Sequence, residues 1–412
     1  MKSYLSLMQK VLDEGALCLN ERTGHSTLRL IGPQLEFWVN KGFPIVTTRK
    51  IDFSKVATEL DWFLQGNTNI TYLKERKNGI WDHWAVSESD LAKCRGRDVY
   101  GNQIRVGDCG PIYGAQWTQW KTSRGVFINQ LNRLLEGLKT HPFSRRHIVS
   151  AWNPEYLPDE EISPQMNVLH GKQCLAPCHT LFQVFLEPAP LWARLKDNGK
   201  EAYIHYVKTY PDFFKPVHLF IRRYYESWGE YHLKNTFCRP FYLKDSSLEE
   251  VSGAAFGDDI FSHEWELELR KLLDHDHLLN LHKILNEDTF VEKPKAYILH
   301  LKMYARSQDL PIGTAFNISS YSLLLALLAH EVNAIPGKYV HTMGDAHIYS
   351  NQVEKVKEQL LRDPLPLPEL KVIEESAPEG AIPYFLSPLL KGRGLRLVGY
   401  QSHPVLKYPI AV

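Results

Sequence analysis

The sequence has almost no net charge, because 48 lysines and arginines oppose 47 aspartates and glutamates and leave a formal charge of +1 at pH 7. A chain without excess charge of one sign has no general attraction for nucleic acid or for an anionic membrane surface. An anionic ligand would have to be held by a local cluster of cations. We therefore expect neither a nucleic-acid-binding protein nor a membrane protein.

Cysteine is also sparse, with six residues at irregular spacing. This pattern does not indicate a disulfide framework, so we expect a reduced, cytoplasmic protein. No apolar run suggests a transmembrane span, and the first residues, MKSYLSLMQKVLDEG, lack the apolar core of a signal peptide. They predict an amphipathic helix with Leu5, Met8, Val11 and Leu12 on one face. Heptads, internal repeats and low-complexity tracts are missing as well.

The 412 residues are 44% apolar, which is enough for a large buried core. FSKVATELDWFLQG (53–66) is apolar at helical spacing and predicts a helix that stops at Gly66. ISSYSLLLALLAHEV (318–332) is apolar on nearly all sides and predicts a helix inside the core. FPIVTTR (43–49) and RRHIVSAWN (145–153) have the β-branched density of strands. These mixed signals predict an α+β fold.

The middle of the chain differs in composition from the segments on either side, because it is rich in aromatic and charged residues. It lies between two strand-like segments, TLFQVFLE (180–187) and AYILHLKMYARSQD (296–309). We therefore predict a core formed by residues 1–187 and 297–412, interrupted by an inserted subdomain at 188–296.

Two features of the insertion admit more than one reading. His275, His277 and His282 have a spacing that can bind metal on a helix, although such histidines more often lie on a solvated face. The aromatic and basic stretch HLFIRRYYESWGEYH resembles a nucleic-acid surface, but a local packed core is the stronger interpretation. The insertion is also a candidate docking site for a protein partner.

The segment QCLAPCHTLFQ (173–183) places Cys174 and Cys178 four positions apart, with His179 directly after the second. A zinc site needs about four ligands, and a redox pair usually has a C-x2-C spacing, so neither fits well. Two buried structural cysteines, or one nucleophile, remain. A nucleophilic thiolate needs nearby positive charge. Arg22, Arg145, Arg146 and Arg306 stand in separate motifs that could converge on a phosphate.

A series of further motifs occurs in a fixed order along the chain. They are YLSLMQKVLDEG, NERTGHSTL, GFPIVTTRK, ELDWFLQGNTNI, IWDHWA, GPIYGAQW, SRRHIVSAWNP, LAPCHTLFQ, RSQDLPIGTAFNISSYSLL, GDAHIYSNQ and HPVLKYPIAV. With these motifs the chain resembles the thymidylate synthase family over roughly residues 1–185 and 297–412. The resemblance implies that family's fold, a mixed β-sheet with packed helices, and a homodimer formed across the sheet.

The resemblance also implies an activity, the reductive methylation of dUMP to dTMP with 5,10-methylenetetrahydrofolate as cosubstrate and without a metal. Cys178 matches the family's nucleophile, which adds to C6 of the pyrimidine, and Cys174 is then a packing residue. Glu59 matches a buried glutamate that acts through ordered water on O4, and burial would raise its pKa. Tyr113 matches a tyrosine near the nucleophile.

The remaining site residues carry over from the same resemblance. Those that match catalytic positions besides Cys178, Glu59 and Tyr113 are Arg306, Asn317 and Asp309. Those that match substrate contacts are Arg22, Arg145, Arg146, His179, Arg306, Ser307, Asn317, His347 and Tyr349, with Arg145 and Arg146 supplied across the dimer interface. Those that match folate contacts are Ile80, Trp81, Leu175, Asp309, Gly313, Phe316 and Val412.

The resemblance leaves two related activities to consider. Relatives that use dCMP carry an aspartate at the position of Asn317, so the asparagine favours dUMP. Phage-type dUMP hydroxymethylases share the cysteine and the asparagine but let water quench the intermediate, giving 5-hydroxymethyl-dUMP. Trp81, Leu175 and the intact C-terminal tail favour exclusion of water and hence methylation.

Several residues depart from the family's pattern. Ala305, Pro311, Thr314 and Ala315 are unusual, the order Arg49-Lys50 is inverted, and Asp52 and Ser54 replace basic residues. These departures put contacts with a folate polyglutamate tail in doubt and leave the nucleotide residues unchanged.

Overall fold

The computed structural model describes most of the predicted core and part of the predicted insertion. The described residues are 1–20, 24–93, 96–189, 205–206, 208–217, 271, 273–287, 297–373 and 393–410. The chain divides into two compact units: Met1–Leu186, Leu299–Val332 and Pro336–Val412 form the first, and Glu187–Ile298 with Asn333–Ile335 form the second.

The larger sheet has five strands, and it carries the segments that surround the two cysteines. Its order is β3 (Gln34–Trp38), β10 (Ile335–Met343), β8 (Tyr297–Ala305), β7 (His179–Pro188) and β6 (Ile148–Ser150). The strands β7 and β8 confirm the two strands predicted on either side of the insertion. Strand β6 confirms the core of the strand predicted around residues 145–153, with three residues in the ladder.

A second sheet has four strands in the order β1 (Ala16–Asn20), β2 (His25–Ile31), β11 (Asp345–Tyr349) and β9 (Gln308–Asp309). Strands β1, β2 and β11 pair antiparallel, whereas β11 and β9 run parallel with His347 opposite Asp309. The mixture of pairings and of helices with strands confirms the predicted α+β class. The register also places two predicted site residues side by side.

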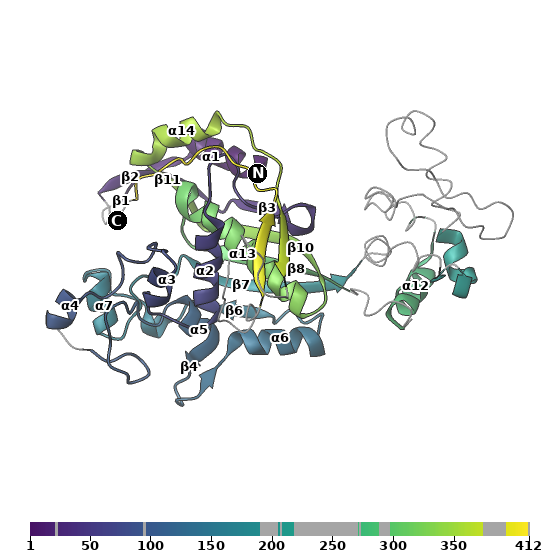
Figure 1. The fold of residues 1–412 in the computed structure, drawn as a ribbon, viewed down its shortest axis with the longest axis horizontal. Helices are drawn as coiled ribbons and strands as arrows, with labels where there is room; N and C mark the ends of the chain where they lie inside the picture. The colour runs from purple at the N-terminus through teal and green to yellow at the C-terminus, as the bar shows by residue number, and fades with distance from the viewer. Residues whose placement is uncertain are drawn as a thin grey trace. The chain divides into compact units, whose positions relative to one another are not determined.

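Two helices predicted from apolar spacing pack against each other in the first unit (Figure 1). Helix α2 (Phe53–Leu64) begins at Asp52, whose side chain accepts a bond from Ser54 N, and the chain turns away at Gly66 with φ +71°. Helix α13 (Ala315–Glu331) is buried on nearly every side, as its even apolar composition predicts. Both predicted helices are therefore confirmed.

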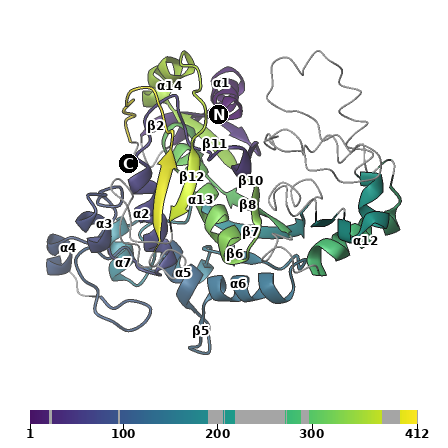
Figure 2. The ribbon, with the colours of Figure 1, turned by 45° about the vertical axis from the view of Figure 1, so that its right-hand side comes forward.

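The long apolar helix corrects one expectation. Residues Leu310–Glu331 are long and apolar enough to cross a membrane by length and composition, contrary to the prediction that no such run exists. In the structure 72% of an 18-residue apolar window within that stretch is buried in the protein. Figure 2 shows the two-stranded sheet of β12 (Glu369–Ile373) and β13 (Gly394–Val398) beside it. Arg393, just before β13, forms a 2.5 Å ion pair with Glu331 at the end of α13.

The N-terminal helix forms as predicted, and its buried face includes two of the four predicted residues. Helix α1 (Lys2–Glu14) buries Tyr4, Leu7, Met8 and Val11, whereas Leu5 and Leu12 are only half-buried. Tyr4 supplies the difference, because its hydroxyl donates to the carbonyl oxygen of Leu310 at 3.0 Å and so draws that side of the helix into the core.

The strand predicted at residues 43–49 is wrong. This segment is extended and buried, but it has no ladder with a neighbouring strand. Its backbone bonds instead go to irregular segments: Phe43 N donates to Pro368 O, His403 N donates to Thr47 O, and Tyr400 Oη donates to Val46 O. β-Branched residues favour extended backbone, and they do not specify what lies beside it.

The described part of the second unit contains a small apolar core. Tyr206 and Phe214 are buried and stack with their ring centroids 5.3 Å apart. Helix α12 (His275–Glu287) confirms that the histidine-bearing segment is helical. His277 Nε2 lies 3.0 Å from Phe213 O, and the side chains of His275 and His282 fall outside the described residues. No group of three or more metal-ligating side chains occurs among the residues described.

Helix α13 predicts a measurable difference between two chemically identical substitutions. Leu324 is fully buried, so Leu324→Ala should lower the free energy of unfolding by about 2–5 kcal/mol through lost burial and a residual cavity. Leu361 is 87% exposed, and Leu361→Ala should change that free energy by less than about 0.5 kcal/mol. Urea unfolding followed by tryptophan fluorescence compares the two. Equal unfolding midpoints would contradict the burial of α13.

Candidate active site

Cys178 stands at the end of a loop, immediately before strand β7. Its backbone N–H donates to the hydroxyl of Tyr113 at 2.9 Å, and its carbonyl accepts from Arg306 N at 2.8 Å. Tyr113 is the first residue of helix α5 (Tyr113–Gln119), and Arg306 directly follows strand β8. Two segments far from Cys178 in sequence therefore fix its backbone, and its side chain is half-buried.

The guanidinium of Arg306 folds back onto the same loop. Its Nε donates to Pro177 O and its Nη2 to Ala176 O, both at 3.0 Å. Its carbon Cζ lies 5.7 Å from the ring centroid of Trp152. The positive charge is thus held against the two residues that precede Cys178, and Nη1 makes no hydrogen bond within the described chain. This is the kind of environment that favours a thiolate and an anionic ligand.

His179 points from β7 into a buried aromatic setting. Its ring stacks on Tyr113 with centroids 4.0 Å apart and planes 16° apart. Its Nδ1 lies 2.7 Å from the hydroxyl of Tyr321, on helix α13. Burial, with the nearby His341 as a second cause, lowers the pKa of His179 to about 3. The imidazole is therefore neutral at physiological pH and acts as a hydrogen-bonding group rather than as a cation.

Glu59 lies on the face of α2 that meets the same aromatic side chains. Its Oε1 accepts a 2.7 Å hydrogen bond from Trp81 Nε1. Trp81 lies 6.0 Å from Tyr113 between ring centroids, and Phe63 lies 4.9 Å from Tyr113. Burial raises the pKa of Glu59 to about 7, and the bond from Trp81 lowers it only in part. A carboxyl group with this pKa can exchange a proton near neutral pH.

Asn317 lies in the first turn of α13, and a neighbouring amide orients it. Its Nδ2 donates to Gln308 Oε1 at 3.3 Å, and Thr314 Oγ1 donates to the same oxygen at 3.0 Å. Gln308 is buried in β9, while Asn317 is half-buried. Because Nδ2 faces Gln308, the carbonyl oxygen Oδ1 is directed to the other side.

Asp309 begins the short turn that leads from β9 into α13. Its Oδ1 accepts from Ile312 N and its Oδ2 from Gln352 Nε2, both at 2.9 Å. Burial raises the pKa of Asp309, and these two bonds oppose the shift. Gly313, in the same turn, has open space where a Cβ would be. His347, opposite Asp309 in the sheet, has its Nδ1 2.8 Å from Asp345 Oδ1.

The structure brings together many of the residues predicted from the sequence, but not all of them. The contacts above join Cys178, His179, Glu59, Trp81, Tyr113 and Arg306. Asn317 lies four positions before Tyr321 on α13, and Asp309 and His347 are linked by sheet register. Tyr349 is buried two residues after His347, with its ring centroid 5.0 Å from that of His347. Ile80, Leu175, Ser307 and Phe316 are half-buried. Arg22 and Val412 lie outside the described residues.

Arg145 and Arg146 lie apart from this group. They are exposed in the turn that precedes the edge strand β6. Gln183 Nε2 donates to Arg145 O at 2.8 Å, which fixes the backbone of the turn. Neither guanidinium forms a hydrogen bond or ion pair with any described residue.

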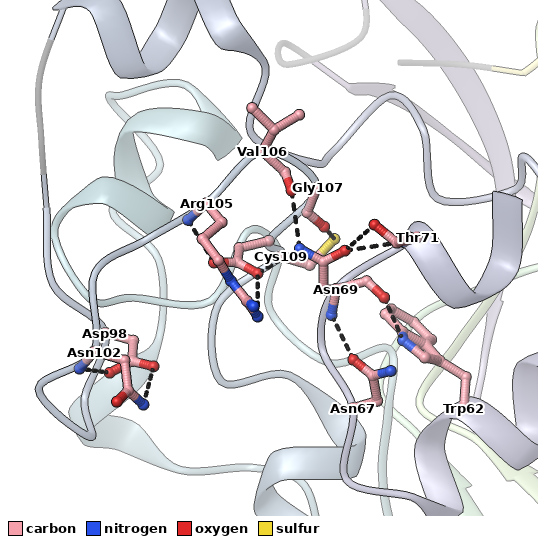
Figure 3. Close-up of polar contacts among 11 residues, drawn as sticks. Trp62, Asn67, Asn69, Thr71, Asp98, Asn102, Arg105, Val106, Gly107 and Cys109 are labelled. Carbon is pink, nitrogen blue, oxygen red and sulfur yellow. Dashed lines mark hydrogen bonds and ion pairs between the residues drawn. The ribbon is translucent and has the colours of Figure 1, made fainter. Parts of the chain in front are cut away.

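Cys174 is buried against a second loop. Its N–H donates to Cys109 O at 3.0 Å. The loop of residues 98–109 is built on side-chain bonds: Asn69 links Thr71 to Val106, and Asp98 accepts from Asn102 (Figure 3). A hollow of about 370 Å³ lies beside it. The carboxylates beside this hollow, Asp98 and Asp108, already accept hydrogen bonds from the loop and so stabilise its conformation. The loop continues through Gly110 and Pro111 to the start of α5, which it therefore helps to position.

Three residues of this arrangement had not been predicted: Gln308, Tyr321 and Gln352. Tyr321 follows Asn317 by four positions on one helix, so helical spacing gives a signal for it. Gln308 and Gln352 have no such signal, since a buried glutamine is identified only by its partners. The site as a whole offers a positively flanked thiol, a carboxyl with a raised pKa and an oriented amide.

Comparison with known protein families gives a match for this chain. The family described as thymidylate synthase matches residues 2–199 and 278–412, which is well over half of the sequence. The stretch between the two matched parts falls within the predicted insertion.

The raised pKa of Glu59 predicts a pH-dependent gain in stability for Glu59→Gln. Between the ordinary pKa of 4.5 and about 7 the folded protein binds more protons than the unfolded chain, so stability falls as pH rises through this window. The variant lacks this fall. It should match the wild type at pH 4 and exceed it by about 1–3 kcal/mol at pH 8. Urea unfolding across this range measures the difference, and parallel pH profiles would contradict the assignment.

Proposed function

The chain belongs to the thymidylate synthase family, and from this premise we propose that it methylates dUMP to dTMP. Membership establishes an enzyme of nucleotide biosynthesis that transfers a one-carbon unit and uses methylenetetrahydrofolate. The choice of dUMP, of methylation and of a dimeric site is our proposal. The observation that carries it is the loop in which Arg306 and Tyr113 fix Cys178.

Cys178 acts as the nucleophile on C6 of the pyrimidine. Formation of the C6–S bond shifts an electron pair towards C5 and O4 and makes C5 nucleophilic. The guanidinium of Arg306 stabilises the thiolate and, through Nη1, reaches the phosphate. Tyr113 holds the nucleophile's backbone, and His347 and Tyr349 bind the sugar.

Glu59 and Asn317 act at the base. Glu59, with a pKa of about 7, moves a proton to and from the O4 side through water. The Asn317 amide is held by Gln308 at 3.3 Å and presents its other edge to the uracil ring. An ionised aspartate at this position would repel the edge of uracil. The presence of an asparagine therefore supports dUMP over dCMP.

The folate side of the site is formed by Asp309, Gly313, Trp81, Ile80, Leu175 and Phe316. Bound methylenetetrahydrofolate supplies the one-carbon unit and the reducing equivalents. The half-buried apolar side chains fit a flat ring system, Asp309 offers a carboxylate to it, and Gly313 leaves room beside it. Trp81 is buried among aromatic rings and the C-terminal segment is bonded to Gln352, and both features support exclusion of water. This supports methylation over hydroxymethylation.

A homodimer completes the site in our proposal. Arg145 and Arg146 are exposed without an internal side-chain partner in the described chain, as expected of residues that serve another protomer. The five-stranded sheet also leaves large apolar side chains exposed at Trp38, Ile148 and Tyr304. A two-fold contact across this sheet would cover them and carry both arginines to the partner's phosphate site.

Product identification tests the reaction. The protein is incubated with dUMP and methylenetetrahydrofolate, the nucleotide is analysed by mass spectrometry, and dihydrofolate is followed by absorbance. We expect dTMP and dihydrofolate in equal amounts, and their loss in Cys178→Ala with dUMP binding retained. 5-Hydroxymethyl-dUMP without dihydrofolate would establish the hydroxymethylase instead. Turnover by Cys178→Ala near the wild-type rate would overturn the nucleophile assignment.

Mixing two inactive variants tests the shared site. Cys178→Ala and Arg146→Ala should each be nearly inactive. After joint refolding in equal amounts, half of the dimers are mixed, and each has one site with an intact cysteine and an intact partner arginine. Activity should therefore recover to about one quarter of the wild-type value. No recovery despite mixed dimers seen by native mass spectrometry would mean that Arg146 serves its own protomer.

A further inference from the structure

Gln352 is fully buried at the end of a short turn, η4 (Ser350–Gln352), between strand β11 and helix α14 (Val353–Leu360). Its amide makes three hydrogen bonds to three separate parts of the first unit. Oε1 accepts from Tyr349 N at 3.1 Å, and Nε2 donates to Asp309 Oδ2 at 2.9 Å and to Pro409 O at 3.2 Å.

These bonds use both N–H groups of the amide and fix its orientation. The carboxylate of Asp309 and the carbonyl of Pro409 accept from one nitrogen, although they lie 43 and 57 positions from Gln352 in sequence. If either acceptor moves away, a buried N–H loses its partner, which is unfavourable. The position of the C-terminal segment and the orientation of Asp309 are therefore joined through a single side chain.

Tyr408 bonds this segment to α14 without involving Asp309, and one of its bonds goes from its hydroxyl to Lys355 O at 3.1 Å. The hydroxyl of Tyr408 donates to Gln359 Oε1 at 2.6 Å, and Gln359 Nε2 donates to Thr48 Oγ1 at 2.7 Å. Gln359 is as fully buried as Gln352 and lies in helix α14, which begins directly after Gln352. It attaches the C-terminal segment to the core without reaching the folate side, so it provides a matched control.

We propose that Gln352 is a positioning residue that couples docking of the C-terminal segment to the orientation of the Asp309 carboxylate, so that the folate contact is complete only when the segment is closed. The inference rests on the proposed function for the role of Asp309 in binding folate. The coupling itself depends only on contacts within the protein. A closed segment keeps water from the site, and a correctly held Asp309 binds the folate ring.

A double-mutant cycle tests the coupling without any ligand. Hydrogen exchange is measured on the C-terminal peptide that contains residues 401–410, in the full-length protein. Asp309 is not bonded to this peptide, yet Asp309→Ala should speed its exchange severalfold, and Gln352→Leu should speed it about tenfold. The double variant should exchange no faster than Gln352→Leu alone, since both changes break one linkage. Additive effects, or no effect of Asp309→Ala, would overturn the proposal.

Two further variants separate coupling from general damage. Gln352→Glu keeps an acceptor for Tyr349 N but replaces the donor that serves Asp309 and Pro409, so it should reproduce the exchange of Gln352→Leu. Gln359→Leu should also speed exchange of the C-terminal peptide, because it removes the acceptor of the hydrogen bond from the Tyr408 hydroxyl. Its effect should add to that of Asp309→Ala. Non-additivity in this control as well would mean that the region merely loosens as a whole, and the proposal would fail.

Kinetics then test the consequence for catalysis. Gln352→Glu should raise the KM for methylenetetrahydrofolate about tenfold and leave the KM for dUMP within about twofold. It should also raise the fraction of 5-hydroxymethyl-dUMP in the product, because water reaches a site that closes less completely. Coupling in the exchange cycle with an unchanged folate KM would overturn the assignment of Asp309 to folate, whereas the absence of coupling would overturn the role of Gln352.

Discussion

The arrangement of the site depends on one arginine that bonds to the backbone of the loop that precedes Cys178. Arg306 uses Nε and Nη2 to hold the carbonyls of Pro177 and Ala176, and its own backbone N–H holds Cys178 O. The end of β8 and the start of β7 are thereby locked at the thiol. Among the described residues Nη1 of the same guanidinium has no hydrogen-bond partner, so the side chain that fixes the loop could also bind an anion.

Burial shifts the pKa values of two titratable groups around this loop in opposite directions, and each shift favours the uncharged form. It raises the pKa of Glu59 to about 7 and lowers the pKa of His179 to about 3, because the charged form of each is disfavoured in a dry environment. Near neutral pH, His179 is neutral and Glu59 is poised to exchange a proton. The positive charge of Arg306 therefore dominates near the thiol, as nucleophilic chemistry on an anionic substrate requires.

Amide side chains provide a second level of organisation. Gln308 orients Asn317, and Gln352 joins Asp309 to the C-terminal segment. Amides suit this task since each can donate and accept without carrying charge into the core. Asn317 and Asp309 are each held by a neutral neighbour, and neither is left to solvent for its orientation.

The sequence by itself determined the two central helices, the strands that flank the insertion and the family of the chain. Spacing of apolar residues specifies which helix face is buried, and ordered motifs identify the family even where single residues are ambiguous. The spacing of apolar residues predicted Leu5 and Leu12 on the buried face of α1. This spacing does not take account of Tyr4, whose hydroxyl donates a hydrogen bond to Leu310 O, 306 positions away. The segment at 43–49 was predicted as a strand because β-branching indicates extended backbone and says nothing about pairing.

Only the tertiary structure decided which side chains hold the site in place. Tyr321 meets His179 across 142 positions, and Gln352 meets Asp309 across 43. A hydrogen bond forms when two atoms lie about 3 Å apart in a suitable direction. That distance depends on how the whole chain packs, and local sequence spacing does not contain it.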